Sequence, residues 1–258
     1  MLVPGRVFGF VSLLALCGVI LAQIHRAKRG VSFDIRRIPA LDSIDEGIGR
    51  ATEMGRPVHF SAGISAFTTA YAPVMLASLE YLSYIARQCA KMGTKVIATA
   101  AQGDTFAVTA EVVKSAYLAE GASDRMPPDA VRFLAANQYV YASSIAGILN
   151  KEQVATNFMI GHWADETLFV AESGHLAGCL GIGGTTNQYQ IAFFVAALDY
   201  VLLSDEIFAG SAYLSRDPVE LGAIAGQDFG KAVAVVLLVL GVLFATANSP
   251  VLVNLMRI

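Results

Sequence analysis

The stretch TKVIATAA, Thr94–Ala101, decides the fold class, because it is a short apolar and β-branched run enclosed by two helical segments. Before it lies APVMLASLEYLSYIARQCAKM, Ala72–Met92, a predicted helix that ends at Gly93, the residue type that left-handed helix caps favour. After it, Asp104 is predicted to cap a helix that runs to Glu120. Helix, strand and helix in this order are typical of a parallel sheet covered by crossover helices.

The same alternation extends over the centre of the chain. Further helices are predicted over Ala40–Met54, Asp129–Gln153, Trp163–His175, Gln188–Ala197 and from Asp205, and further strands over Pro57–Ser61, Val154–Gly161, Cys179–Gly184 and Asp199–Ser204. The fold class is therefore α/β, with three layers and a mainly parallel sheet of about five strands, either Rossmann-like or flavodoxin-like. Since no internal repeat or low-complexity linker interrupts the pattern, we expect one domain over residues 38–230.

Both ends of the chain carry apolar runs, in a sequence that is 55% hydrophobic and only 15% charged. Val7–Ile24 is uncharged and long enough to cross a bilayer core, whereas Ala232–Ala247 is shorter but continues into the apolar Val251–Leu255. A cleaved signal peptide is the alternative for the first run, but the end of that run makes a poor cleavage site. We therefore expect an N-terminal transmembrane anchor over residues 1–24 and a C-terminal transmembrane helix and tail over residues 231–258.

Residues 25–37 form a basic juxtamembrane collar with five Lys or Arg and one Asp, and only Arg6 stands on the other side of the first run. Since positive charge beside a membrane helix stays on the cytoplasmic side, the pattern predicts an N-terminus outside the cell membrane and a cytoplasmic domain. Lys231, just before the second run, agrees, because two spans place both termini on one side. The collar suits the anionic headgroups of the lipid bilayer.

The domain between the apolar runs is acidic, because residues 38–230 contain ten basic and twenty acidic side chains. Without a basic stripe it is not expected to bind nucleic acid, and solubility explains most of its charge. Cys17, Cys89 and Cys179 show neither a CxxC motif nor a Cys/His spacing. Reduced thiols of this kind fit a cytosolic domain and predict no metal site.

Three segments carry a family resemblance: RRIPALDSIDEGIGRATEMGRPVHFSAG at Arg36–Gly63, VVKSAYLAEG at Val112–Gly121 and DPVELGAIAGQDFGK at Asp217–Lys231. In these segments the chain resembles an uncharacterised prokaryotic family of membrane-anchored proteins that is known as a domain of unknown function. The resemblance covers most of the chain between the apolar runs. It implies a membrane-tethered globular domain and supplies no catalytic residues.

A glycine-rich stretch, GIGGTTNQ at Gly181–Gln188, is the main candidate for a binding site. Gly181 and Gly183 match the first two glycines of a dinucleotide fingerprint, Thr186 replaces the third, and Asp205 lies where a ribose-binding acid is expected. The candidate cofactor-binding residues are therefore Gly181, Gly183, Gly184, Thr185, Thr186, Asn187 and Asp205, and a nucleotide is the one cofactor they would hold. We favour the alternative, a tight turn without a ligand, because the third glycine is absent and the preceding strand is short.

Other polar residues should gather beside this stretch, because ligands of a parallel sheet bind at the carboxyl ends of its strands. They are Ser61, Gly63, Gln102–Thr105, His162, Asp165, Glu166 and Ser204–Glu206. The HWADE segment at 162–166 has a helical spacing of histidine and carboxylates, but it lacks a third metal ligand nearby, and the start of a helix explains the carboxylates better. No GxSxG, HExxH or Walker lysine is present, so no catalytic residue is predicted, which argues against an enzyme.

The helical segments Tyr139–Leu149 and Ile191–Leu198 are apolar nearly all round, which favours burial on more than one face. Contact between subunits would supply that burial, so we expect a homo-oligomer or a place in a membrane complex. The first hypothesis is a non-catalytic scaffold or assembly domain, and the second is a small-ligand or nucleotide-binding protein that uses residues 183–187 and Asp205. A transporter is disfavoured, since the two spans offer neither a charged pair within the membrane nor a repeated bundle.

Overall fold

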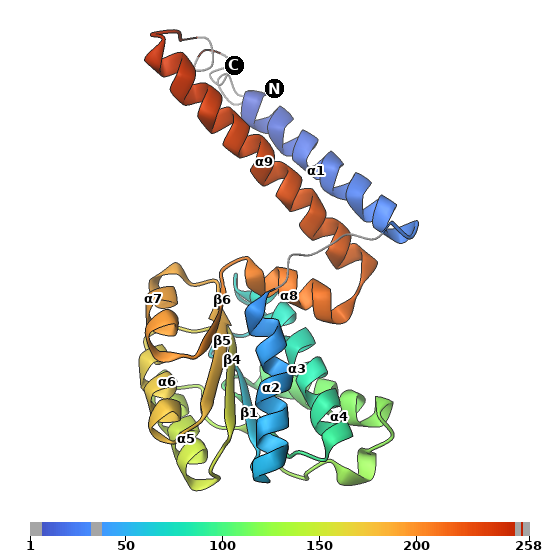
Figure 1. The fold of residues 1–258 in the computed structure, drawn as a ribbon, viewed down its shortest axis with the longest axis vertical. Coiled ribbons are helices and arrows are strands. Elements are labelled where there is room, and N and C mark those ends of the chain that lie inside the picture. The colour runs from blue at the N-terminus through green and yellow to red at the C-terminus, as the bar shows by residue number, and fades with distance from the viewer. Residues whose placement is uncertain (1–6, 32–37, 251–253, 255–258) are drawn as a thin grey trace. The chain divides into compact units, whose positions relative to one another are not determined.

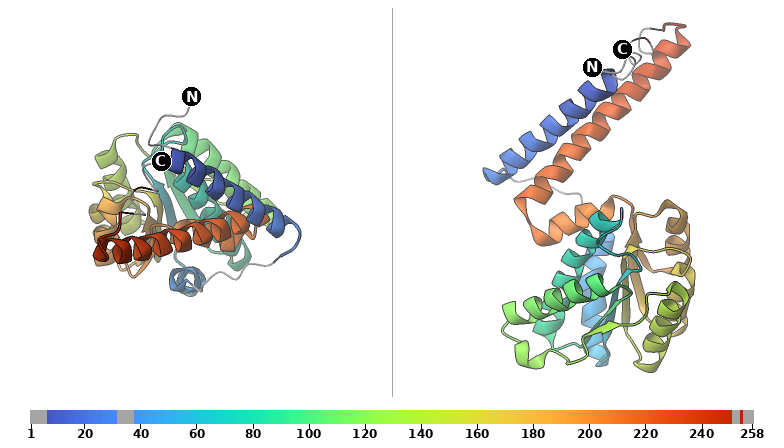
Figure 2. Two further views of the ribbon diagram at one scale, coloured as in Figure 1. Left: turned by 90° about the horizontal axis from the view of Figure 1, so that it is seen from above. Right: turned by 180° about the vertical axis from the view of Figure 1, so that it is seen from behind.

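The computed structural model describes residues 7–31, 38–250 and 254, so residues 32–37 of the predicted collar lie outside the described residues. The chain divides into two compact units, the domain Arg36–Ser215 and a unit formed by the two chain ends (Figures 1 and 2). In chain order, the domain contains α2 (Pro39–Met54), β1 (Val58–Gly63), α3 (Ala72–Met92), β2 (Val96–Ala100), α4 (Gly103–Ala119), the 3-10 helix η1 (Ser123–Arg125), β3 (Val131–Phe133), α5 (Gln138–Lys151), β4 (Thr156–His162), α6 (Thr167–Leu176), β5 (Leu180–Thr185), α7 (Gln188–Ala197), β6 (Tyr200–Leu203) and α8 (Glu206–Ser215).

The centre of the domain is a six-stranded parallel sheet with the strand order β3-β2-β1-β4-β5-β6. This order is that of the Rossmann fold, which decides between the two predicted alternatives. One face of the sheet is covered by α2, α3, α4 and α8, and the opposite face by α5, α6 and α7 (Figure 1). The prediction of a three-layer α/β fold is therefore confirmed.

The sheet has six strands where the sequence predicts about five. The additional strand, β3, lies within the stretch Asp129–Gln153 that was predicted to be mainly helical, and helix α5 begins only at Gln138. β3 is an edge strand of three residues that pairs with β2 alone, and its side chains are partly exposed. A short, half-exposed strand has neither an apolar run nor a clear alternation, so the sequence pattern could not reveal it.

Strands β1, β2, β4 and β5 are buried along their whole length, as expected of a parallel sheet covered on both faces. Phe60, Phe158 and Ile182 belong to the larger apolar core, together with residues of α2, α3 and α8. A second apolar cluster joins the sheet to α5, α6 and α7. The two clusters hold the three layers together.

Polar side chains on β1, β2 and β4 form a buried network at the centre of the sheet. His59 Nδ1 donates to Asn157 Oδ1 at 2.7 Å, and His59 Nε2 accepts from the Thr99 hydroxyl at 3.0 Å. Tyr141 of α5 completes the network, because its hydroxyl donates to Thr99 O at 3.1 Å and bonds to Ser61 Oγ at 2.7 Å. Burial lowers the pKa of His59 to about 4, so its ring is neutral at pH 7.

Acid should therefore weaken the domain through His59. The pKa of His59 is 6.5 in the unfolded chain and about 4 in the folded domain, so between these pH values the unfolded chain binds more protons. The free energy of unfolding should therefore fall as the pH drops from 6.5 to 4, by about 3 kcal/mol in total. Denaturant titrations between about pH 4 and 8 measure this loss, and His59→Gln should lack the part of the pH dependence that His59 causes. His175→Gln, at an exposed position, is the control. An unchanged pH slope in His59→Gln would contradict the assignment.

The other unit is a pair of helices, α1 (Val7–Lys28) and α9 (Pro218–Thr246), which run antiparallel along each other (Figures 1 and 2). Both are long and apolar enough to cross a membrane. The predicted boundary between the domain and the second span, at residues 230 and 231, lies inside α9, which is one continuous helix. We call this helix pair the hairpin.

Three glycines of α9, spaced four residues apart, let the two helices of the hairpin approach closely. A Cβ atom added to any of these glycines would collide with α1. It would lie 2.5 Å from Ile24 Cα at Gly222, 2.7 Å from Ile20 Cα at Gly226 and 2.7 Å from Leu16 Cδ1 at Gly230. Small residues at this spacing, packed against large ones, are typical of helix pairs in membranes. The three contacts also set the register between the helices.

Candidate functional site

The candidate site lies at the carboxyl edge of the sheet, where all six parallel strands end. The strand order reverses between β1 and β4, because the chain leaves β1 toward β2 on one side and leaves β4 toward β5 on the other. Ligands of α/β folds bind at such a switch point. Gly63 and His162, both predicted candidates, are the last residues of these two strands and pair with each other. The structure therefore brings them together.

Gly63 and Gly161 let the ends of β1 and β4 approach more closely than side chains would permit. Their φ angles are +90° and +150°. A Cβ on Gly63 would lie 1.8 Å from His162 O, and one on Gly161 would lie 2.1 Å from Ala62 O. The pairing shifts register at this point, yet Ile64 N still donates to His162 O at 3.1 Å. An irregularity of this kind re-aims the side chains that follow it.

His162 is the central polar group of the switch point. Its Nδ1 lies 2.6 Å from Ser65 Oγ, and its ring stacks on Tyr71 with the ring centroids 3.5 Å apart. The Ser65 hydroxyl and Nδ1 share this hydrogen bond, and the buried Nε2 on the other side of the ring has no hydrogen-bond partner among the described residues. Burial also lowers the pKa of His162, which keeps the ring neutral near pH 7. An unpartnered buried ring nitrogen calls for a hydrogen-bond partner from elsewhere, such as a polar atom of a ligand.

Two acidic residues at this edge, Glu166 and Asp104, bind neighbouring segments of the chain. Buried Glu166 accepts from Gln138 Nε2 at 2.7 Å, and burial raises its pKa. Asp104 accepts from Phe67 N at 3.0 Å, in the loop after β1. The prediction that Asp104 caps α4 is wrong, because the helix begins one residue earlier and Gln102 occupies the cap position. Among the described residues no group of three His, Cys, Asp or Glu could hold a metal ion.

Most of the glycine-rich stretch is strand. Gly181, Gly183 and Gly184 lie inside β5, which is buried and paired with β4 on one side and β6 on the other. A Cβ on Gly183 would lie 2.5 Å from Leu198 Cδ1 and 2.8 Å from Phe194 Cε1. The absence of side chains here therefore makes room for α7 and the residues that follow it. Ligand binding by these three glycines stays a prediction.

The remaining residues of the predicted nucleotide site meet at the carboxyl edge. Thr185 ends β5, Thr186 follows it, and Asp205 follows the adjacent strand β6. Asn187 caps α7, and its Nδ2 donates to Trp163 O at 2.9 Å. Asn187 therefore ties the loop after β5 to the loop after β4, next to His162.

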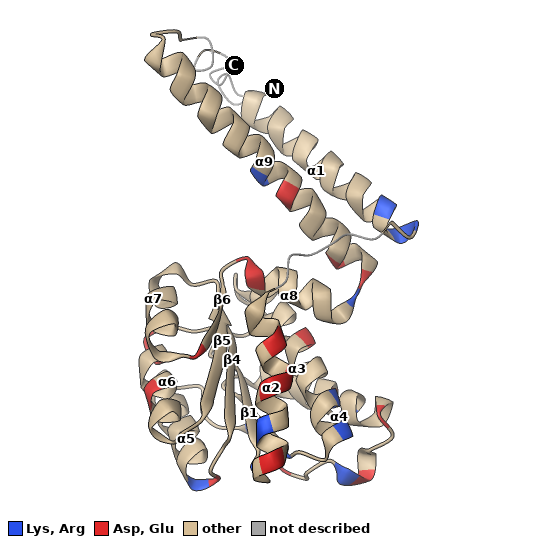
Figure 3. Ribbon diagram, in the orientation of Figure 1, with Lys and Arg blue, Asp and Glu red and all other residues tan. Residues whose placement is uncertain are grey.

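The charges at this edge disfavour an anionic ligand. The strand ends and the loops after them, residues 61–71, 100–105, 133–138, 162–167, 184–188 and 203–206, contain no Lys or Arg. Their charged residues are all acidic: Asp104, Asp165, Glu166, Asp205 and Glu206. Figure 3 shows Lys and Arg of the domain toward the opposite edge, where the strands begin. Phosphates are usually bound with the help of Lys or Arg, so a neutral or cationic ligand fits this edge better.

Ser65 and Tyr71, which contact His162, were not among the site residues predicted from the sequence. Both belong to the stretch ISAFTTAY, residues 64–71, between β1 and α3. The available signal was a hydroxyl-rich loop directly after a predicted strand. Its position beside β4 depends on the strand order, which the sequence did not show.

A second candidate is a surface, the outer side of α5, α6 and α7, which we call the outer layer. Among the Lys, Arg, Asp and Glu residues, only Lys151 and Glu172 occur on these helices, whereas α2, α3 and α4 carry eleven (Figure 3). The three helices pack side by side, α5 on α6 and α6 on α7. Their exposed large apolar side chains are Tyr139, Val140, Leu168, Phe169, Leu176, Tyr189, Phe193 and Val195. Extended apolar patches of this kind mark interaction sites.

Replacing Gly183 by Val should destabilise the domain by about 3 kcal/mol or more, because the new side chain collides with Leu198 and Phe194 inside the core. Thermal or denaturant unfolding measures the change. Gly49→Ala in α2 is the matched control, since nothing lies within 4 Å of its Cβ position, and it should stabilise the domain by roughly 0.5–1 kcal/mol. A Gly183→Val variant as stable as wild type would show that β5 is not packed as described.

Comparison with known proteins gives one family. A family model described as Domain of unknown function (DUF6754) matches residues 2–256, nearly the whole chain. No curated protein and no solved structure matches it. The match confirms the resemblance to a family defined by a domain of unknown function.

Proposed function

The chain belongs to the DUF6754 family, and we propose that it is a membrane-tethered α/β domain that assembles with copies of itself. The outer layer carries this proposal, because it is apolar, exposed and almost free of charge. The rest of the domain surface is rich in acidic residues, which repel one another between identical copies. The outer layer is therefore the surface through which two copies can approach at the lowest electrostatic cost.

The tether in this proposal is the hairpin, with the N-terminus outside the cell membrane and the domain in the cytoplasm. Its two helices are long and apolar enough to span a bilayer. His25, Arg26 and Lys28 in the last turn of α1 give that end the positive charge that stays on the cytoplasmic side. Anchoring would also concentrate the copies in one plane, which strengthens a weak contact between domains.

A carboxylate in the outer layer should dissociate the assembly. Tyr189→Asp and Leu176→Asp place a charge where the side chain is 87% and 77% exposed and would become buried in the contact. Native mass spectrometry in mild detergent should show a smaller assembly for both variants than for wild type. Leu118→Asp is the matched control, since Leu118 is 66% exposed on α4, in the charged layer, and it should leave the mass unchanged. A monomeric wild type would refute the proposal.

A second candidate function is the binding of a small ligand at the carboxyl edge of the sheet. The observation that favours it is the unpartnered Nε2 of His162 at the switch point. The predicted nucleotide site at 183–187 and Asp205 shares this edge. Trp163, the one tryptophan of the chain, is buried directly after His162, so its fluorescence would report a ligand bound there.

Protein extracted from its own membrane should then carry a neutral or cationic small-molecule mass. Replacing His162 by Gln should release that mass and change the emission of Trp163, because the ligand loses its hydrogen bond with Nε2. Asn187→Ala is the comparison variant. An adduct that His162→Gln keeps and Asn187→Ala loses would place the ligand in the predicted site at 183–187 instead.

A further inference from the structure

Two charged residues of α9 lie level with the middle of α1. The three glycine contacts show that each residue forward along α9 lies opposite one residue backward along α1. Asp228 is therefore level with Gly18, and Lys231 is level with Ala15. Both levels fall within about one helical turn of the centre of the uncharged stretch Val7–Ile24. The charged pair is therefore not at the end of the hairpin.

The uncharged stretch of α1 sets the level of the bilayer. It is bounded by Arg6 before it and by Arg26 soon after it, and its 18 residues rise about 27 Å, close to the thickness of a bilayer core. Glu220 of α9 is level with Arg26, so the charges of both helices coincide at that boundary. A bilayer that covers this stretch must also contain Asp228 and Lys231. No charged pair was predicted within the spans, because the second span was predicted at Ala232–Ala247, after both residues.

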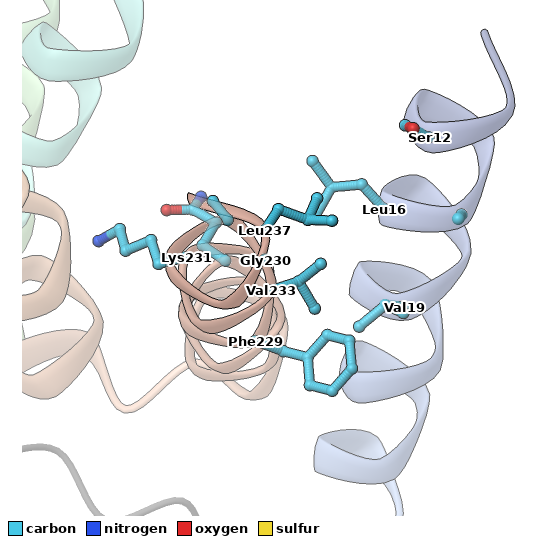
Figure 4. A pocket seen from close by; sticks show the side chains of 11 residues that line it. Ser12, Leu16, Val19, Phe229, Gly230, Lys231, Val233 and Leu237 are labelled. Atoms are coloured by element: carbon cyan, nitrogen blue, oxygen red, sulfur yellow. The ribbon is translucent and has the colours of Figure 1, made fainter. Parts of the chain in front are cut away.

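The pair points away from α1. Lys231 Nζ lies 3.7 Å from Asp228 Oδ1, and the two side chains are 55% and 67% exposed. Figure 4 shows Lys231 directed away from α1, while Leu16, Val19 and Val233 line an apolar hollow of about 570 Å³ between the helices. Lys231 also contributes to the lining of this hollow, but both side chains of the pair remain more than half exposed. Ionisable side chains inside a membrane face protein or water and avoid lipid, so a further element must cover them.

We propose that Asp228 and Lys231 form the contact through which the hairpins of two copies join within the bilayer. Each copy presents one carboxylate and one ammonium group, so in a two-fold arrangement Asp228 of one copy meets Lys231 of the other, and the reverse contact forms as well. This charge complementarity favours a second copy over an unrelated helix. The inference rests on the membrane-spanning part of the proposed function and does not depend on the outer layer.

Complementary variants test the contact in the full chain, reconstituted in lipid nanodiscs or vesicles, with Tyr189→Asp present in every chain to remove the outer-layer contact. Lys231→Asp leaves two negative groups on each hairpin, and Asp228→Lys leaves two positive groups. Each variant alone should lose its dimer fraction about tenfold or more, whereas a mixture of the two, carrying different tags, should recover paired chains. Glu220→Gln, on the same helix at the boundary level, is the matched control and should pair as wild type.

Other outcomes overturn the proposal. If each variant pairs with itself as wild type does, the charges are not in the contact. If the mixture fails to pair while both variants are inserted and folded, the charges act only within one hairpin. If wild type pairs with a different membrane protein and not with itself, the occupant is another chain.

Labelling of the native Cys17 tests separately whether this part of α1 lies inside the bilayer. It is exposed on α1 and within one residue of the level of Asp228, whereas Cys89 and Cys179 are buried in the domain. A maleimide that cannot cross membranes should label Cys17 in denatured protein and leave it unlabelled in intact vesicles. Labelling in intact vesicles would refute the membrane placement on which the proposal rests. The outer-layer variants Tyr189→Asp and Leu176→Asp should keep both the pairing of the hairpins and the protection of Cys17.

Discussion

The domain depends on the contact between β1 and β4, two central strands that lie about a hundred residues apart in the chain. Phe60 pairs with Phe158, and every other strand is added outward from this pair, β2 and β3 on one side and β5 and β6 on the other. Gly63 and Gly161 permit the close approach at its carboxyl end. The buried network around His59 uses side chains from both strands, and His162 at the end of β4 stacks on Tyr71, which lies in the loop after β1. Core stability and the candidate ligand site thus share one structural origin.

Charge divides the domain into two chemically different sides. The layer of α2, α3 and α4 is charged, as suits a surface in water, whereas the outer layer of α5, α6 and α7 is nearly uncharged. The carboxyl edge of the sheet carries only acidic charges. An apolar face suits contact with protein, and an acidic edge suits a neutral or cationic small molecule, so the two proposed activities use separate surfaces and do not exclude each other.

The α/β class, the three layers and most element positions could be predicted from the sequence, because Gly93 and the apolar run around Val96–Ala100 are local signals. Strand β3 could not be predicted, since an edge strand of three residues is too short to show a hydrophobic pattern in the sequence. The sequence also predicted His162 and Gly63 as strand-end residues, but their meeting depends on strand order, a long-range property. The strand at Cys179–Gly184 was predicted, and β5 confirms it, but the sequence did not show that its glycines make room for Leu198 and α7, because that packing is a long-range contact.

The glycine-based packing of the hairpin has a consequence for how the protein is made. Nearly two hundred residues separate Lys28 from Pro218, so under the proposed topology α1 enters the bilayer long before α9 is synthesised. At usual elongation rates the ribosome needs about ten to forty seconds for that interval. During this time the Leu16, Ile20 and Ile24 side of α1 faces lipid, and the domain folds between two events of membrane insertion. The hairpin then closes last, so its formation marks a completed chain.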